Sequence, residues 1–167
     1  MGDTMEYFVM KSDGRIRNPL RIDTSAIDLD TTEAFVAYAD FQPNTTFVDY
    51  FMIKKLFQYS FCVSDSLKEM LDIYADRLTA VPFFITDRAQ KGQKVYWKLH
   101  IELQDCLEKK PYMRYDELTL HKDKIPNKHI FRVAFQKQEY LIVSLNLAEN
   151  ILRKNPSGIQ FIPVTIQ

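Results

Sequence analysis

Few side chains in this sequence could carry catalytic chemistry. The candidates are three histidines and two cysteines, at His100, His121, His129, Cys62 and Cys106. A cysteine acts as a nucleophile when a base lies beside it, and Cys106 with His121 could form such a pair. Asp105 or Asp123 would then orient the imidazole. Nothing else in the sequence supports this pairing, so we do not expect it to be an active site.

Motifs that recruit phosphates, metals or acyl groups are missing from the sequence. It contains no glycine-rich phosphate loop, G-x-S-x-G elbow, H-E-x-x-H or paired C-x-x-C motif, and it has only four glycines. Asp28 and Asp30 have the D-x-D spacing of a metal loop, but the glycine and terminal glutamate of a calcium loop do not follow. The sequence therefore predicts no catalytic residue, no cofactor and no metal site. We expect a protein that is not an enzyme.

The charges of the chain are balanced, with 22 Lys and Arg residues against 22 Asp and Glu residues. Such a chain has no net field to attract nucleic acid or an anionic membrane, so neither is a predicted partner. The aromatic run from Phe47 to Ile53 could stack on bases, but stacking platforms come with excess basic charge, and we interpret the run as core. With a composition that is 46% hydrophobic, residues 1–167 are expected to form one domain.

The sequence also bears on the compartment of the protein. Cys62 and Cys106 are too few for a disulfide scaffold and lie in apolar segments, which favours buried thiols in a reducing environment. The first residues lack the basic start and apolar run of a signal peptide, and no stretch has the length of a membrane span. A cytoplasmic protein is therefore expected.

The clearest structural unit runs from Tyr140 to Val164. Residues 140–143 form an apolar, partly β-branched run typical of a buried strand, and Ser144 can cap the amphipathic helix that follows. The tetrapeptide Asn-Pro-Ser-Gly ends this helix, because proline cannot continue the backbone ladder and Gly158 can adopt a positive φ. Residues 159–164 then resume as a strand.

A weaker copy of this unit spans Phe61 to Ile85, displaced by 80 residues along the chain. In both copies a serine, Ser64 or Ser144, follows an apolar strand and precedes a helix, and the strand after the helix contains a proline. The match predicts an internal repeat of residues 61–85 and 140–164. Strand, serine, helix and strand is also a common local arrangement, so two unrelated units are the alternative.

Strand patterns predominate outside these two units. Residues 6–11 and 16–22 are predicted to form an N-terminal hairpin, and residues 83–85 are predicted to pair with residues 94–101. The last of these strands alternates in polarity, which predicts a buried face and a polar face. The buried face would carry Val95, Trp97, Leu99 and Ile101, and the polar face would carry Lys94, Tyr96, Lys98 and His100.

The segment from Asp23 to Thr32 is polar and acidic, and we interpret it as a solvated loop or a frayed helix start. Residues 32–38 could form either a helical turn or a strand. Because a period of 3.6 is clear only after Ser64 and Ser144, the sequence predicts an α+β fold. In this fold a mostly antiparallel sheet carries a few short helices.

Five segments resemble a family of immunity proteins of bacterial polymorphic toxin systems, a family formerly known as a domain of unknown function. These segments are Ile130–Arg132, Val143–Ser144, Gly158–Val164, Val95–Leu99 and Asp105–Leu107. The similarity covers residues 47–167, whereas residues 1–46 form a variable N-terminal segment. The resemblance implies a cytosolic protein that binds a cognate toxin and neutralises it by non-covalent occlusion.

Two exposed segments compete as the surface that binds this partner. A toxin that acts on nucleic acid is expected to have a basic active site, so a carboxylate surface would fit it. The acidic N-terminal segment supplies such a surface, with the candidate residues Asp23, Asp28, Asp30 and Glu33. The basic loop from His121 to His129 is the competitor, and it would suit an acidic partner.

Two other functions are open from the sequence. The chain could be an α+β ligand-binding or structural domain, and an uncharacterised enzyme is less favoured because the chemical motifs are missing. The sequence identifies neither the toxin nor the oligomeric state, because an inhibitor's fold does not record the chemistry of its target.

Overall fold

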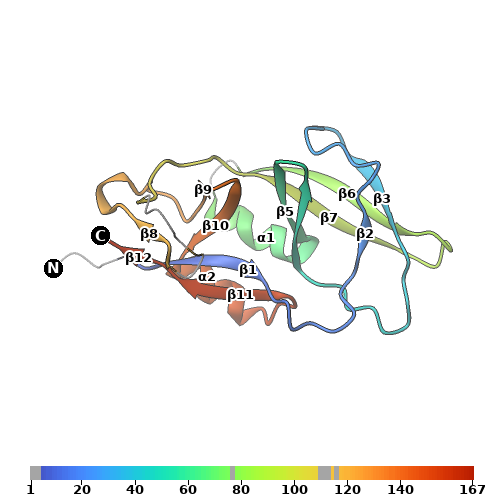
Figure 1. Cartoon of the computed structure of the whole chain (residues 1–167). Helices are drawn as coiled ribbons and strands as arrows, with labels where there is room; N and C mark the ends of the chain where they lie inside the picture. Colours follow the sequence, from blue (N-terminus) through green and yellow to red (C-terminus); the bar gives the residue numbers. More distant parts are fainter. Residues whose placement is uncertain (1–4, 76–77, 109–113, 115–116) are drawn as a thin grey trace.

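The computed structural model describes residues 5–75, 78–108, 114 and 117–167, and its strands form two main sheets (Figure 1). The first sheet has the strand order β11-β1-β10-β9, and the second has the order β2-β3-β6-β7-β5-β4. In the first sheet the strands are β1 (Tyr7–Ser12), β9 (Ile130–Phe135), β10 (Gln138–Ser144) and β11 (Ile159–Pro163). In the second they are β2 (Ile22–Asp23), β3 (Phe35–Ala39), β4 (Tyr50–Lys55), β5 (Gln58–Ser64), β6 (Thr79–Asp87) and β7 (Gln93–His100).

The remaining elements are short. A small parallel pair joins β12 (Thr165–Ile166) to β8 (Thr119–Leu120), near the 3-10 helix η2 (Lys122–Lys124). Two α-helices occur in the described residues, α1 (Asp65–Tyr74) and α2 (Leu145–Arg153). Within both main sheets every pairing is antiparallel except that of β3 with β6. The predicted α+β fold with mostly antiparallel strands and a few short helices is confirmed.

Two halves of the fold repeat each other. The unit β4-β5-α1 corresponds to β9-β10-α2 with an offset of 80 residues at each strand and helix start. After each helix the returning strand also matches in register, because Pro82 lies opposite Trp97 and Pro163 lies opposite Phe8. The similarity predicted for residues 61–85 and 140–164 is therefore present in the structure, and it extends upstream to include a complete β-hairpin.

In each half, one more strand lies between the hairpin and the strand that follows the helix. The two halves take this strand from different parts of the chain. In one half β7 lies between β5 and β6, and it follows them in the chain. In the other half β1 lies between β10 and β11, and it comes from the N-terminus. The predicted N-terminal hairpin is therefore wrong, because both edges of β1 are already paired with C-terminal strands.

The two helices lie side by side and share one core with a face of each main sheet. Leu67 and Leu71 of α1 and Leu147 and Ile151 of α2 are buried in this core. The loop after α2 ends as predicted, with Gly158 at a φ of +87°. A Cβ at Gly158 would lie 2.8 Å from the Cβ of Val48, so glycine also permits close contact between the halves.

The N-terminal segment covers the other face of the large sheet, which corrects two predictions. Ile27 and Leu29 are buried against this sheet, so residues 23–32 are not a freely solvated loop, and residues 35–39 after them form a strand. Because the sheet is covered on both faces, the simple alternation predicted for β7 fails. Tyr96 and Lys98, expected on the polar face, are buried, whereas Val95, expected inside, is exposed.

Ser64 and Ser144 cap the two helices as predicted. The Ser64 Oγ accepts a hydrogen bond from the Leu67 N–H at 3.4 Å, and the Ser144 Oγ accepts one from the Leu147 N–H at 3.3 Å. These bonds satisfy backbone donors that a helix start leaves without intrahelical partners.

Replacing Ser144 with alanine should lower the free energy of unfolding by about 0.5–2 kcal/mol, the usual value of a lost N-cap. Urea unfolding would measure the change, with Asn146→Ala, an exposed position on the same helix, as the control. If Ser144→Ala kept its stability but lost partner binding, Ser144 would be a contact residue instead of a cap.

Candidate functional site

The four predicted acidic residues are all exposed: Asp23 ends β2, and Asp28, Asp30 and Glu33 lie in the segment that joins β2 to β3. Asp23 accepts a hydrogen bond from Arg88 Nη2 at 2.8 Å. The pKa of Asp23 is lowered, mainly by hydrogen bonds from Ser25 and to a smaller extent by the positive charge of Arg88. Asp30 accepts hydrogen bonds from Gln58 Nε2 at 3.1 Å, and Asp28 accepts one from the Asp30 N–H at 2.9 Å. Asp28 and Asp30 thus lie beside the β4–β5 hairpin, whereas Asp23 is engaged by a cation.

Two lysines of the large sheet fix this acidic segment in place. Lys55 Nζ donates to the Ile27 carbonyl at 2.6 Å, and Lys98 Nζ donates to the carbonyls of Leu29 and Thr31. Burial lowers the pKa of Lys98, while the charges of nearby acidic groups, including Asp28 and Asp30, oppose this shift. The backbone that carries the carboxylates is therefore held by the buried Lys98 and the half-buried Lys55, which limits the entropy lost when a partner binds.

The tip of the β4–β5 hairpin carries two large apolar side chains in solvent. Leu56 is 87% exposed and Phe57 is 77% exposed, and Leu56 has a φ of +54°. Sequence reasoning did not single out this pair. Contiguous exposed apolar side chains often mark a contact surface, whereas scattered ones need no explanation.

The repeated fold supplies an internal comparison for this tip. The equivalent tip of the β9–β10 hairpin is formed by Gln136 and Lys137, and Gln136 has a φ of +49° that matches Leu56. A tip of the same length therefore forms with polar side chains, although its second residue differs in backbone: Lys137 has a φ of +63°, whereas Phe57 has no positive φ. A hairpin of this length does not need leucine and phenylalanine at its tip, and the comparison of the two tips at an offset of 80 residues is the sequence signal that could have identified them.

The two hairpin tips and the acidic segment form one continuous surface. Gln58 joins the β4–β5 tip to Asp30, as described above. On the other side, the Tyr59 hydroxyl donates to the Lys137 carbonyl at 2.8 Å, and Lys137 Nζ lies 5.4 Å from the centre of the Phe57 ring. We call the surface of Leu56, Phe57, Asp28, Asp30 and Lys137 the tip surface.

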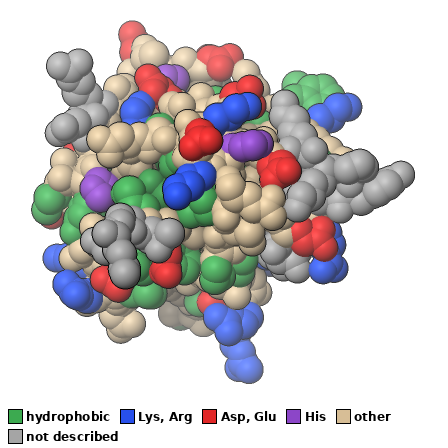
Figure 2. All heavy atoms as spheres, turned by 90° about the vertical axis from the view of Figure 1, so that its left-hand side faces the viewer, with side chains coloured by type: hydrophobic (Ala, Val, Ile, Leu, Met, Phe, Trp, Pro, Cys, Tyr) green, Lys and Arg blue, Asp and Glu red, His purple; other side chains and the backbone are tan. Residues whose placement is uncertain are grey.

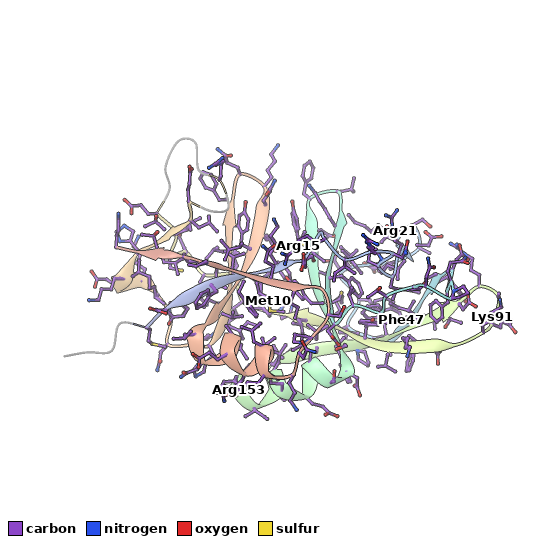
Figure 3. The ribbon with its side chains drawn as sticks, turned by 90° about the horizontal axis from the view of Figure 1, so that it is seen from below. Met10, Arg15, Arg21, Phe47, Lys91 and Arg153 are labelled. Atoms are coloured by element: carbon purple, nitrogen blue, oxygen red, sulfur yellow. The ribbon has the colours of Figure 1, made fainter. Side chains whose placement is uncertain are left out.

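A groove opens between the two hairpins, below the tip surface. Its volume is about 300 Å³, and its lining includes Met10, Tyr50, Phe61 and Leu141 from the shared core. Figure 3 shows Met10 on β1 between the β9–β10 hairpin and the β4–β5 hairpin. The groove is mainly apolar, and these four side chains of the shared core form its floor.

A second, more polar cleft of about 1040 Å³ is lined by His100, Glu102, Lys128 and His129. His129 Nδ1 lies 2.7 Å from Ser144 Oγ, which resembles a catalytic contact. That oxygen already caps α2. In the other half the residue equivalent to His129 is Asp49, which accepts a hydrogen bond from the equivalent cap serine, Ser64. We therefore assign the contact between His129 and Ser144 to helix capping.

The pair of Cys106 and His121 does not have the electrostatics of a nucleophile and its base. Cys106 is fully buried in an apolar cluster, and burial raises the pKa of its thiol. The hydrogen bond that joins the two residues runs between their backbones, from the His121 N–H to the Cys106 carbonyl at 2.8 Å. A thiol with a raised pKa is largely protonated at neutral pH.

The competing basic loop lies at the end of the molecule that carries β8 and β12. Figure 2 shows this end with cations and carboxylates interspersed, without a gathering of either sign. Lys128 of the loop forms an ion pair with Glu102. Asp28 and Asp30, in contrast, stand beside exposed apolar side chains, so the tip surface is the stronger candidate.

Two further features concern ligands and membranes. Across the described ranges, no group of three or more His, Cys, Asp or Glu side chains is arranged to hold a metal ion. Among the helices that the structure describes, none is both long and apolar enough to cross a bilayer.

Both cysteines should resist thiol reagents in the folded protein, because burial raises the pKa of Cys106 and of Cys62. Reaction with dithionitrobenzoate at pH 8 should be slow in buffer and should reach two thiols per chain after unfolding in guanidinium. Rapid labelling of Cys106 in the native protein would contradict this account and would reopen the pairing with His121.

Comparison with known families bears on the C-terminal half of the chain. Residues 96–165 match the model of the immunity protein family Imm11. The match includes the β9–β10 hairpin, α2 and β11, and it confirms the resemblance to an immunity protein family. Among curated proteins, none matches this chain.

Proposed function

We propose that this protein is an immunity protein that binds a cognate bacterial toxin through the tip surface and neutralises it by non-covalent occlusion. The family match supports the immunity role. The observation that carries the choice of surface is the contrast between two equivalent hairpin tips, one with exposed Leu56 and Phe57 and the other with Gln136 and Lys137. The site needs no catalytic group, because covering the toxin's active site is sufficient.

The tip surface has the composition of a protein-binding site. Buried aromatic and aliphatic anchors dominate binding energies, and a polar rim excludes water around them. Leu56 and Phe57 supply the anchors, while Asp28, Asp30 and Lys137 supply the rim. The hairpin is paired along its length, from Tyr50 opposite Val63 to Lys55 opposite Gln58, so the anchors are presented on a fixed support.

The carboxylates of the rim favour a partner with a basic surface. Asp28 and Asp30 lie on the exposed side of the segment, and their field would speed association with such a partner. Asp23 is expected to contribute less, because Arg88 forms ion pairs with it and with Asp40. Glu33 is exposed further along the same segment and extends the acidic surface. A toxin that acts on nucleic acid in the cytoplasm would present the matching charge.

The double variant L56Q/F57K should lose toxin binding while it keeps the fold, because it copies the side chains of the second hairpin tip. We expect the affinity for the toxin encoded beside this gene to fall by roughly 30-fold or more, the effect of losing a hot spot of about 2 kcal/mol. Calorimetric titration measures the affinity, and urea unfolding checks the fold. Ile73→Lys, which replaces an exposed apolar side chain on α1, is the control.

Retention of full affinity by L56Q/F57K would remove the hairpin tip from the interface. If the unmutated protein failed to bind the neighbouring toxin at all, the immunity function itself would be wrong. A protein that bound a small molecule instead would support the alternative of a ligand-binding domain.

Charge reversal in D28K/D30K should slow association with the toxin and reduce protection in coexpression. The effect should grow at low salt, because the Debye length rises from about 8 Å at physiological ionic strength to about 30 Å at 0.01 M. The matched control D105K/D123K reverses two exposed carboxylates elsewhere. An association rate equal to that of the unmutated protein, measured by stopped flow, would exclude Asp28 and Asp30 from steering.

A further inference from the structure

The groove between the hairpins is an open end of the shared core. Four buried side chains line its floor: Met10 on β1, Tyr50 on β4, Phe61 on β5 and Leu141 on β10. The Tyr50 hydroxyl donates to the Met10 carbonyl at 3.1 Å, which joins the two sheets at this point. The floor is therefore apolar and fixed in shape.

The mouth of the groove combines apolar walls with a surplus of cations. Met52 is 41% exposed and forms one wall, together with Tyr59. Glu139 at the opposite wall is neutralised by Arg132, whose Nη1 lies 2.6 Å from the Glu139 carboxylate. Because that carboxylate is compensated, it does not cancel other positive charge at the mouth.

Lys54, which lines the groove, and Lys137, on the adjoining hairpin tip, supply this positive charge. Lys54 Nζ lies 5.3 Å from the centre of the Tyr59 ring, and Lys137 Nζ lies over the Phe57 ring. Within the described part of the chain, neither lysine forms an ion pair with a carboxylate. Both remain able to pair with a carboxylate of a partner, and each is held near the groove by an aromatic ring.

We infer that this groove receives one apolar side chain of the toxin, of leucine to phenylalanine size, flanked in the toxin sequence by carboxylates. The inference rests on the proposed function and adds the chemistry of the toxin segment. The volume of about 300 Å³ lies at the lower limit of ligand pockets, which suits a single side chain better than a larger molecule. The cations at the mouth complement the flanking carboxylates.

Each partner then inserts side chains into the other. Leu56 and Phe57 of the tip surface enter the toxin, and the groove between the hairpins receives a side chain of the toxin. Asp28 and Asp30 contact a basic part of the toxin on one side of the tip, and Lys54 and Lys137 contact an acidic segment on the other. This alternation of charge across one interface fixes the orientation of the toxin.

Site-specific photo-cross-linking tests the inference against the toxin encoded beside this gene. The photoreactive residue p-benzoylphenylalanine is placed singly at Met52 in the groove, at Phe57 on the tip, and at Ile73 on α1 as the control. Mass spectrometry then identifies the linked toxin peptides. We expect links from Met52 and Phe57 and none from Ile73, and the peptide linked to Met52 should contain a large apolar residue within two positions of Asp or Glu.

The possible failures are distinguishable. A link from Phe57 without one from Met52, or a Met52-linked peptide without acidic residues, overturns the groove inference and leaves the proposed function standing. Links from neither position in a protein that still binds the toxin overturn both the groove and the tip surface. Absence of toxin binding by the unmutated protein overturns the immunity function and the inference with it.

Substitutions give an independent measurement of the same groove. Met52→Trp should fill the mouth and weaken toxin binding at least tenfold with unchanged urea unfolding, and K54E/K137E should weaken it most at low salt. The control K122E/K124E reverses two exposed lysines of η2 and should have no effect. Wild-type affinity in both groove variants would overturn the inference.

Discussion

The structure depends on two reciprocal helix caps. The Ser64 hydroxyl donates to Asp49 Oδ1 at 2.7 Å, and Asp49 Oδ2 accepts a hydrogen bond from the Ser157 N–H at 2.7 Å, in the loop after α2. In the other half, Ser144 contacts His129, whose ring packs edge-on against Tyr74 at the end of α1. The residue before each hairpin thus contacts the cap serine of its own helix, and it also contacts the other half, through the loop after α2 for Asp49 and through the last residue of α1 for His129. This arrangement fixes the two hairpins relative to each other.

Because the two halves share the same hairpin and helix at an offset of 80 residues, side-chain differences between them help to separate folding from function. Polar Gln136 and Lys137 satisfy the turn in one hairpin, so Leu56 and Phe57 in the other are available for binding. Arg132, the equivalent of Met52, is held by Glu139 and by the Ile101 carbonyl. The groove between the halves is therefore apolar on one wall and charge-compensated on the other.

The parts of the fold that were predictable from sequence have local signals. Ser144 and Gly158 mark a helix start and a positive φ through their own chemistry, and the strand pair of residues 83–85 and 94–101 is adjacent in the chain. The position of β1 was not predictable, because its partners lie more than a hundred residues away. Burial of Lys98 was also missed, since it depends on the carbonyls of a segment that only the folded chain brings near. The acidic residues were chosen from composition alone, and their neighbour Phe57 was overlooked because the repeat was predicted only from residue 61 onward, so the two hairpin tips were not compared.

Hydrogen exchange of the free protein and of its complex with the neighbouring toxin would show whether the two hairpins bind the toxin. Toxin binding should slow amide exchange in residues 28–30, 52–59 and 137–141, which form the tip surface and the groove. The outer faces of α1 and α2 should exchange as in the free protein. Slowing confined to the loop from His121 to His129, or to the outer faces of the helices, would contradict the claim that the two hairpins bind the toxin.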